Sequence, residues 1–330
     1  RMTGWPRPSL FSLAGTRLGA LPVGAAAAHL DALADAMVYL GPPASLTREQ
    51  APPTYFDAPY RAELTRRAWI EWGDSSRLDR FLPFGRVTEH DFHSRILGST
   101  RHLRIYTPPG YGRGDTLCDL LVGFDGAVYT GDIPLPAILD SLIAARAIPP
   151  TVAVLIDNGS GAVRLGDLAN HAAFAAFVGN ELVPWIRRNY RVSPVPGRVV
   201  ITGSSAGGLA AAYIALERPD LFGNVLSQSG AFWRGDEGSN DPPWEYITRR
   251  AAVLSHREIR FLLDVGDRET RGAMQGRAPS ILAANRRLRD ALEARGYRVM
   301  YTEVPGGEHS PASWRLRLPV DLVTLMGEAP

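Results

Sequence analysis

The segment Val199-Val-Ile-Thr-Gly-Ser-Ser-Ala-Gly-Gly208 decides the fold of this chain. Its first four residues are apolar or β-branched and predict a buried strand, whereas the Ala-rich segment after Ser205 predicts a helix. Between them, Gly203-Ser-Ser-Ala-Gly207 matches G-x-S-x-G, the pattern of a tight strand-to-helix turn that projects a serine oxygen above a sheet. Ser205 is therefore the candidate nucleophile, and the backbone N–H of Ala206 is a candidate donor to an oxyanion.

Strand and helix patterns alternate on both sides of this segment, as in a mainly parallel, doubly wound sheet. Strands are expected over Val87–Leu97, His102–Tyr106, Leu120–Phe124, Val152–Ile156, Val199–Thr202, Asn224–Ser227, Arg260–Val265 and Val299–Glu303, the first two antiparallel. Helices are expected over Leu135–Arg146, Leu168–Arg188, Ala206–Glu217, Ile281–Arg295 and Trp314–Met326. The predicted class is α/β, an α/β-hydrolase fold with helices on both faces of the sheet, in a catalytic domain of residues 86–330.

Residues 1–85 differ from the rest because prolines interrupt any long regular element. We expect a short irregular region that serves as an accessory segment or partial lid, with one helix over Ala25–Leu40 and an element of undecided type over Glu63–Trp72. The Ala-rich stretch Leu13–Ala28 is a weak candidate for an export signal. A cytoplasmic location is expected, with a periplasmic or secreted location left open.

Composition excludes several classes of function. The 36 basic and 34 acidic residues give a formal charge of +2 without a basic tract, so we expect no nucleic-acid partner. The chain has no lysine, which excludes a Schiff-base mechanism and a Walker-type phosphate loop. Its one cysteine, Cys118, excludes an internal disulfide and a cysteine-rich metal site. No apolar run reaches the roughly 18 residues that insert into a membrane, and we expect no metal and no cofactor.

Partners for the serine follow downstream. His309 ends the loop Pro305-Gly-Gly-Glu-His309 after a predicted strand, where this fold places its general base. Two carboxylates, Asp267 and Glu269, follow the preceding strand, and either could orient His309. A serine–histidine dyad without an acid also stays open.

A second oxyanion donor should come from the loop after Leu120–Phe124. The segment Asp125-Gly-Ala127 brings backbone close to the nucleophile there. We expect the N–H of Gly126 to be that donor, with Ala127 as the alternative.

These residues resemble the enterochelin (enterobactin) esterase family, within the esterase D/feruloyl esterase group of α/β-hydrolases. The likeness extends from about Phe92 to Met326. Its motifs are Leu97-Gly-Ser-Thr-Arg101, Ile105-Tyr-Thr-Pro108, Phe124-Asp-Gly126, Arg164 with Glu181-Leu-Val-Pro184, Gly203-Ser-Ser-Ala-Gly-Gly-Leu209, Arg218-Pro-Asp-Leu-Phe-Gly223, Leu226-Ser-Gln-Ser-Gly-Ala-Phe-Trp233, and Gly306-Gly307 with His309 and Trp314-Arg315. A Gly followed three residues later by Glu is similar to the family pattern at Gly266, so the resemblance favours Glu269 over Asp267.

The chain also departs from that family. Glu308 is inserted between the glycine pair and the histidine, and Ser310 stands where the family often has Asp. The family's N-terminal domain is a β-rich module that helps to cover the substrate, whereas residues 1–85 are short and proline-rich.

The resemblance implies a serine esterase acting on the trilactone of catecholate siderophores or on their ferric complexes, with iron arriving as part of the substrate. Such a polyanion would suit Arg164, Arg234 and Arg271. Trp233 could stack on a catechol ring, with a packing role in the core as the alternative. The alternatives are a general carboxylesterase for feruloyl or acetyl esters, an acyltransferase with the same covalent intermediate, and a non-catalytic siderophore-binding protein.

Overall fold

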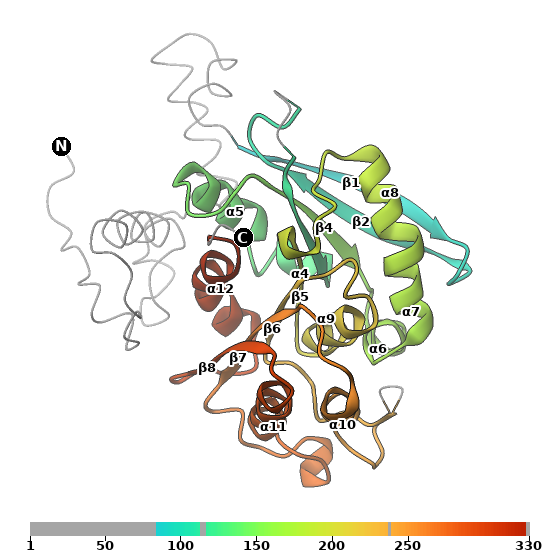
Figure 1. Cartoon of the computed structure of the whole chain (residues 1–330), viewed down its shortest axis with the longest axis vertical. Coiled ribbons are helices and arrows are strands. Elements are labelled where there is room, and N and C mark those ends of the chain that lie inside the picture. Colours follow the sequence, from blue (N-terminus) through green and yellow to red (C-terminus); the bar gives the residue numbers. More distant parts are fainter. Residues whose placement is uncertain (1–83, 113–116, 237–238, 328–330) are drawn as a thin grey trace, which may run out of the picture.

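The structure is a computed structural model that describes residues 84–112, 117–236 and 239–327. A single sheet with the strand order β1-β2-β4-β3-β5-β6-β7-β8 runs through it (Figure 1). The strands are β1 (Arg86–Ser94), β2 (Ser99–Thr107), β3 (Asp119–Phe124), β4 (Thr151–Asp157), β5 (Val199–Ser204), β6 (Asn224–Gln228), β7 (Arg260–Gly266) and β8 (Arg298–Val304).

Only the first strands of this sheet are antiparallel. β1 pairs with β2 through the turn at Gly98, whose φ of +61° suits glycine, and β2 runs antiparallel to β4. Every pair from β4 to β8 is parallel. The predicted mainly parallel sheet, with its antiparallel opening pair, is therefore confirmed.

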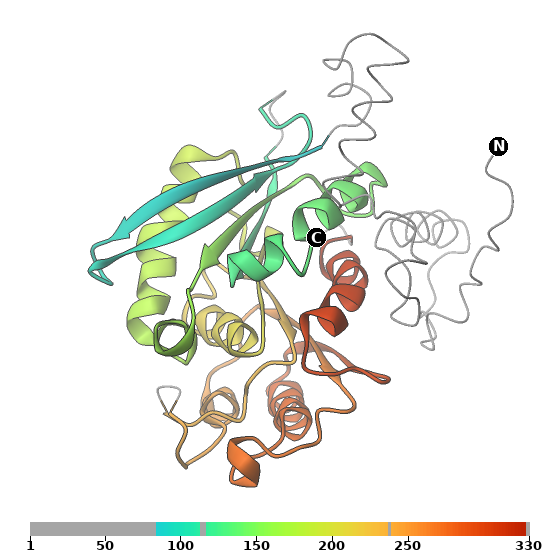
Figure 2. The same ribbon diagram turned by 180° about the vertical axis from the view of Figure 1, so that it is seen from behind.

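Apolar residues alternate along the inner strands between two cores. In β3, Leu120 and Val122 belong to one buried cluster and Leu121 to the other. The two cores are covered by helices on opposite faces, as Figures 1 and 2 show from front and back. One face carries α4 (Gly126–Thr130), α5 (Leu135–Ala144) and α12 (Pro311–Met326); the other carries α6 (Gly161–Leu168), α7 (Ala172–Ala176), α8 (Val183–Asn189), α9 (Ala206–Glu217), α10 (Tyr246–Val253) and α11 (Ile281–Ala294).

One expected helix, Leu168–Arg188, is wrong as a single element. α6 ends at Leu168, and Asn170, with a φ of +55°, breaks the chain before α7 begins. A π-helical stretch, Phe177–Leu182, then joins α7 to α8. The apolar periodicity there is real, since Phe174 and Phe177 are fully buried, but it does not reveal a left-handed residue. Three helices were not predicted, namely α4, α10 and α6, of which only Leu168 falls within a predicted helix.

Three predictions for the front of the chain lie outside the described residues: the helix over Ala25–Leu40, the element over Glu63–Trp72 and the signal-like stretch Leu13–Ala28. Within the described residues, the helices are all too short or too polar to traverse a lipid bilayer.

Candidate active site

Ser205 occupies a strained turn at the centre of the sheet. It follows β5, which lies between β3 and β6, and its φ and ψ of 57° and −119° are unusual for a residue with a side chain. Its N–H donates to the Gln228 carbonyl at 2.9 Å, which ties the turn to the end of β6. A Cβ on Gly203 would lie 2.5 Å from the Gly207 carbonyl carbon, so the turn requires glycine at that position.

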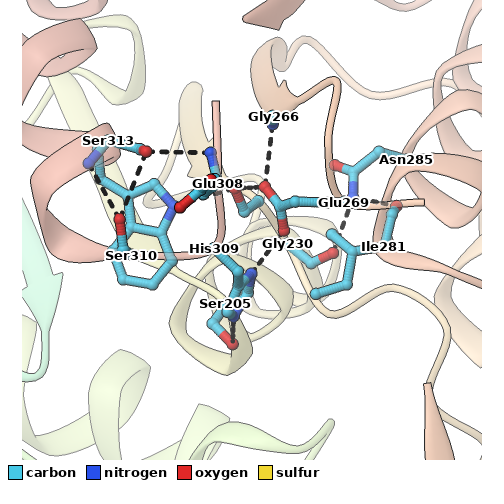
Figure 3. Close-up of polar contacts among 12 residues, drawn as sticks. Ser205, Gly230, Gly266, Glu269, Ile281, Asn285, Glu308, His309, Ser310 and Ser313 are labelled. Carbon is cyan, nitrogen blue, oxygen red and sulfur yellow. Dashed lines mark hydrogen bonds and ion pairs between the residues drawn. The ribbon is translucent and has the colours of Figure 1, made fainter. Parts of the chain in front are cut away.

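His309 meets this serine from the loop after β8. Its Nε2 lies 2.9 Å from the Ser205 Oγ (Figure 3). Ser310 caps α12 by accepting the Ser313 N–H, so the histidine stands immediately before a fixed helix start. The extra residue Glu308 points away toward Arg268, 3.1 Å distant, and so leaves His309 on the serine.

Glu269 holds the other nitrogen of that histidine. Its Oε2 lies 2.6 Å from His309 Nδ1, and its Oε1 accepts from Ser229 Oγ at 2.6 Å and from the Gly266 N–H at 2.9 Å. Only 3% of its side chain is exposed. Asp267 instead accepts the Gly306 N–H at 2.8 Å, and so braces the histidine loop. The structure therefore brings Ser205, His309 and Glu269 together and leaves Asp267 aside.

Two helices begin beside the serine. Ala206 is the first residue of α9 and Gly126 the first residue of α4, and these helices follow the adjacent parallel strands β5 and β3. First-turn N–H groups have no acceptor within their own helix, so both can donate to a developing anion. A Cβ on Gly126 would lie 2.7 Å from Asp157 Oδ1, so close packing requires glycine there.

The loop before Gly126 is clamped from two directions. Asp125 has a φ of 56°, and its N–H donates to Asn158 Oδ1 at 3.1 Å. Its two carboxylate oxygens accept from Nε and a terminal nitrogen of Arg164, both at 2.6 Å. We expected Arg164 to contact substrate, but its guanidinium instead forms a bidentate ion pair with Asp125 of the protein itself.

The other expected substrate contacts, Trp233, Arg234 and Arg271, have different surroundings. Trp233 is only 7% exposed; its ring packs 6.1 Å from Trp244, and the Arg234 guanidinium lies 5.0 Å from its centroid. This burial favours the packing alternative for Trp233, because Trp244 and Arg234 already contact its ring. Arg271 is exposed, two residues beyond Glu269.

No side-chain role was predicted from sequence for Asp125, Asn158, Ser229 or Trp314. Asp125, Ser229 and Trp314 each lie within a motif that carried the family resemblance, and that was the signal available. Among the described residues, no group of three or more His, Cys, Asp or Glu is arranged to hold a metal ion.

Known proteins resemble this chain over the same region. The family described as "Putative esterase" matches residues 94–325. The iron(III) enterobactin esterase of Dickeya dadantii (strain 3937) is 32% identical over 239 residues, which cover 70% of this chain and 52% of that protein. The iron(III) salmochelin esterase of Escherichia coli O6:H1 is 28% identical over 256 residues, covering 75% and 58%.

Solved structures also resemble this chain. The enterobactin esterase of Shigella flexneri, determined in the presence of enterobactin, has a TM-score of 0.63 at 29% identity, covering 73% of this chain and 59% of that one. A ferulic acid esterase shares the fold, with a TM-score of 0.59 at 17% identity. The chain spans about half the length of the curated relatives it matches. Because the family match extends over most of the chain and includes the strands that carry Ser205, Glu269 and His309, this chain belongs to the esterase family.

Proposed function

We propose that this protein is a serine esterase that hydrolyses carboxylic ester bonds, with the trilactone of a catecholate siderophore or its ferric complex as substrate. The single observation that carries the proposal is the continuous hydrogen-bonded line from Ser205 Oγ through the His309 ring to the Glu269 carboxylate. Such a line is the arrangement that turns a serine hydroxyl into a nucleophile.

The reaction follows from this geometry in two halves. Ser205 Oγ attacks the ester carbonyl while His309 Nε2 takes its proton, and buried Glu269 stabilises the imidazolium that forms. The N–H groups of Ala206 and Gly126 hold the oxyanion. His309 then gives its proton to the departing alcohol oxygen, which leaves an acyl group on Ser205. Water, activated by the same histidine, releases the acid and restores the serine.

Exposure of the reacting groups supports hydrolysis of a substrate that arrives from solvent. Ser205 is half-buried and 36% of the His309 side chain is exposed, whereas Glu269 is buried behind them. The siderophore assignment is supported by the relatives whose names specify enterobactin and salmochelin. The proposed reaction requires no nucleic-acid partner.

A general carboxylesterase is the second candidate, and one observation favours it. Three of the four side chains expected to recognise a ferric catecholate are engaged within the protein, Arg164 with Asp125, Arg234 with Asn240 and Trp233 with Trp244. A neutral aromatic or acetyl ester would need none of them.

Hydrolysis of enterobactin and of its ferric complex, followed by chromatography, separates these candidates when p-nitrophenyl acetate and methyl ferulate are run in parallel. Release of dihydroxybenzoyl-serine at a kcat/KM well above that of the simple esters, abolished in Ser205→Ala, is the expected result. Turnover of the simple esters alone would leave the serine mechanism standing and remove the siderophore. If Ser205→Ala keeps wild-type turnover of every ester, the mechanism is wrong.

We further propose that residues 86–330 form the catalytic domain and that residues 1–85 serve it as an accessory region. For a siderophore substrate, hydrolysis after import assigns the activity to the cytoplasm. Fractionation of the producing cells, with the esterase activity assayed in each fraction, tests that location.

A further inference from the structure

We propose that Ser229 is a positioning residue, held by Trp314, that orients the catalytic acid Glu269 toward His309. This inference rests on the proposed serine mechanism and extends it from three residues to five. It concerns two buried side chains, Ser229 on the acid and Trp314 on the base.

Hydrogen-bond accounting gives the direction of each contact. Trp314 Nε1 lies 2.9 Å from Ser229 Oγ, and an indole N–H can only donate. Ser229 Oγ therefore accepts from Trp314, and its single proton is left for Glu269 Oε1, 2.6 Å away. An ionised carboxylate only accepts, so the contact is a charge-assisted bond with a defined direction.

The second donor to the same oxygen fixes the plane of the carboxylate. The Gly266 N–H reaches Glu269 Oε1 at 2.9 Å, so two donors hold Oε1 while Oε2 faces His309 Nδ1 at 2.6 Å. Without Ser229, one backbone donor remains and the carboxylate can rotate about its terminal torsion, which is broad for glutamate. The His309 ring would then lose a partner of fixed direction.

Ser229 itself stands on a rigid support. Its φ is +50°, its N–H donates to the Asp264 carbonyl at 2.8 Å, and it is 1% exposed. The next carbonyl, that of Gly230, accepts from Asn285 Nδ2 at 2.8 Å (Figure 3). These contacts fix the backbone of Ser229, and the hydrogen bonds to Trp314 and Glu269 fix its hydroxyl.

Trp314 links this support to the base. It lies in the first turn of α12, five residues after His309, and the edge of one ring meets the face of the other with centroids 5.1 Å apart and planes at 89°. Trp314 thus contacts the histidine ring directly and the acid through Ser229, so one residue sets both ends of the acid–base hydrogen bond.

The test is a double-mutant cycle between Ser229→Ala and Glu269→Gln, read as kcat on p-nitrophenyl acetate. If Ser229 acts through Glu269, Ser229→Ala should lower kcat about 10- to 100-fold in the wild-type background, with KM little changed. In the Glu269→Gln background, the same change should cost less than about 3-fold, because the carboxylate that Ser229 orients is gone.

Ser227→Ala is the matched control. Ser227 lies two residues earlier on β6, is fully buried, and its Oγ has no hydrogen-bond partner among the described residues. We expect its kcat within about 2-fold of wild type. Trp314→Phe, which keeps an aromatic ring beside His309 and removes the N–H, should lower kcat about 3- to 10-fold. It replaces Ser229→Ala in the cycle if that variant does not fold.

Two results would overturn the inference: an unchanged kcat in Ser229→Ala, or an equal loss with and without the Glu269 carboxylate. Labelling of Ser205 by a fluorophosphonate provides a readout that needs no natural substrate. If the siderophore is not hydrolysed but labelling slows in Ser229→Ala, the substrate proposal fails and this inference stands. If Ser205→Ala is labelled like wild type, the serine mechanism itself has failed.

Discussion

Replacing Glu269 by glutamine removes the charge of the proposed acid while preserving its shape. The carboxylate accepts three hydrogen bonds, two at Oε1 from Ser229 and Gly266 and one at Oε2 from His309. A glutamine amide has only one oxygen. With that oxygen on the two donors, its NH₂ faces His309 Nδ1, which must then accept.

The reversed amide is worse, since it would set the NH₂ against two donors. The first orientation makes three hydrogen bonds, whereas the reversed one makes one and leaves two buried donors unpaired. At about 1 to 3 kcal/mol for each unpaired donor, the first orientation prevails by several kcal/mol. With Nδ1 as acceptor, the ring proton moves to Nε2, the atom 2.9 Å from Ser205 Oγ. The histidine then donates to the serine and cannot take its proton.

We expect kcat to fall about 10⁴-fold at neutral pH, the size of loss produced by the wrong histidine tautomer. That corresponds to about 5 kcal/mol of transition-state stabilisation. Initial rates with saturating p-nitrophenyl acetate measure it, and thermal melting verifies that the variant is folded.

Asp267→Asn is the matched control, because asparagine keeps an oxygen for the Gly306 N–H. We expect its kcat within about 3-fold of wild type. A Glu269→Gln enzyme that keeps more than a tenth of wild-type kcat would refute the reasoning, and a large loss in Asp267→Asn would reassign the acid.

Arg164→Gln should lower kcat on neutral p-nitrophenyl acetate about 10-fold or more, because the oxyanion loop loses its clamp on Asp125; a rise in KM for anionic esters alone would assign Arg164 to substrate binding instead. Gly203→Ala should lower the free energy of unfolding by about 2 kcal/mol or more, because its Cβ meets backbone at 2.5 Å. The Cβ of Gly166→Ala would meet no neighbouring atom within 4 Å, so this variant should keep or raise Tm. Equal Tm values for Gly203→Ala and Gly166→Ala would contradict the packing argument. Burial beside a second carboxyl raises the pKa of Asp321 well above its usual range. The folded state therefore holds a proton that the unfolded chain releases, so stability is lost as pH rises above about 4. In urea unfolding, Asp321→Asn should therefore gain stability relative to wild type as the pH rises from 4 to 8; the same difference in stability at both pH values would contradict this.

The sheet could be predicted because each of its strands is a short apolar or alternating run bounded by turn residues. The serine and histidine could be placed because the fold locates them by strand order. Strand order alone could not decide which of Glu269 and Asp267 is the acid, since both residues follow β7. The turn closed by the Glu269 N–H on the Gly266 carbonyl, 3.1 Å apart, aims one carboxylate at the histidine and leaves the other on Gly306.

The sequence pattern could not predict which side chains contact one another. Arg164 and its partner Asp125 are 39 residues apart, and an arginine on a loop forks onto protein and ligand anions equally well. Nothing in the sequence around Trp233 distinguishes an aromatic ring that packs in the core from one that binds a ligand. Ser229 and Trp314 come together only when α12 packs beside β6, although each lies in a motif that was noticed.

The site takes its parts from the ends of different strands, and this spacing has a consequence for synthesis. Ser205 precedes Glu269, and His309 comes 104 residues after the serine. At about 5 to 20 residues per second, roughly 5 to 20 s separate the addition of the nucleophile from that of its base. A growing chain therefore carries its nucleophile before it can use it, and ester cleavage begins only once the segment around His309 has joined the folded sheet.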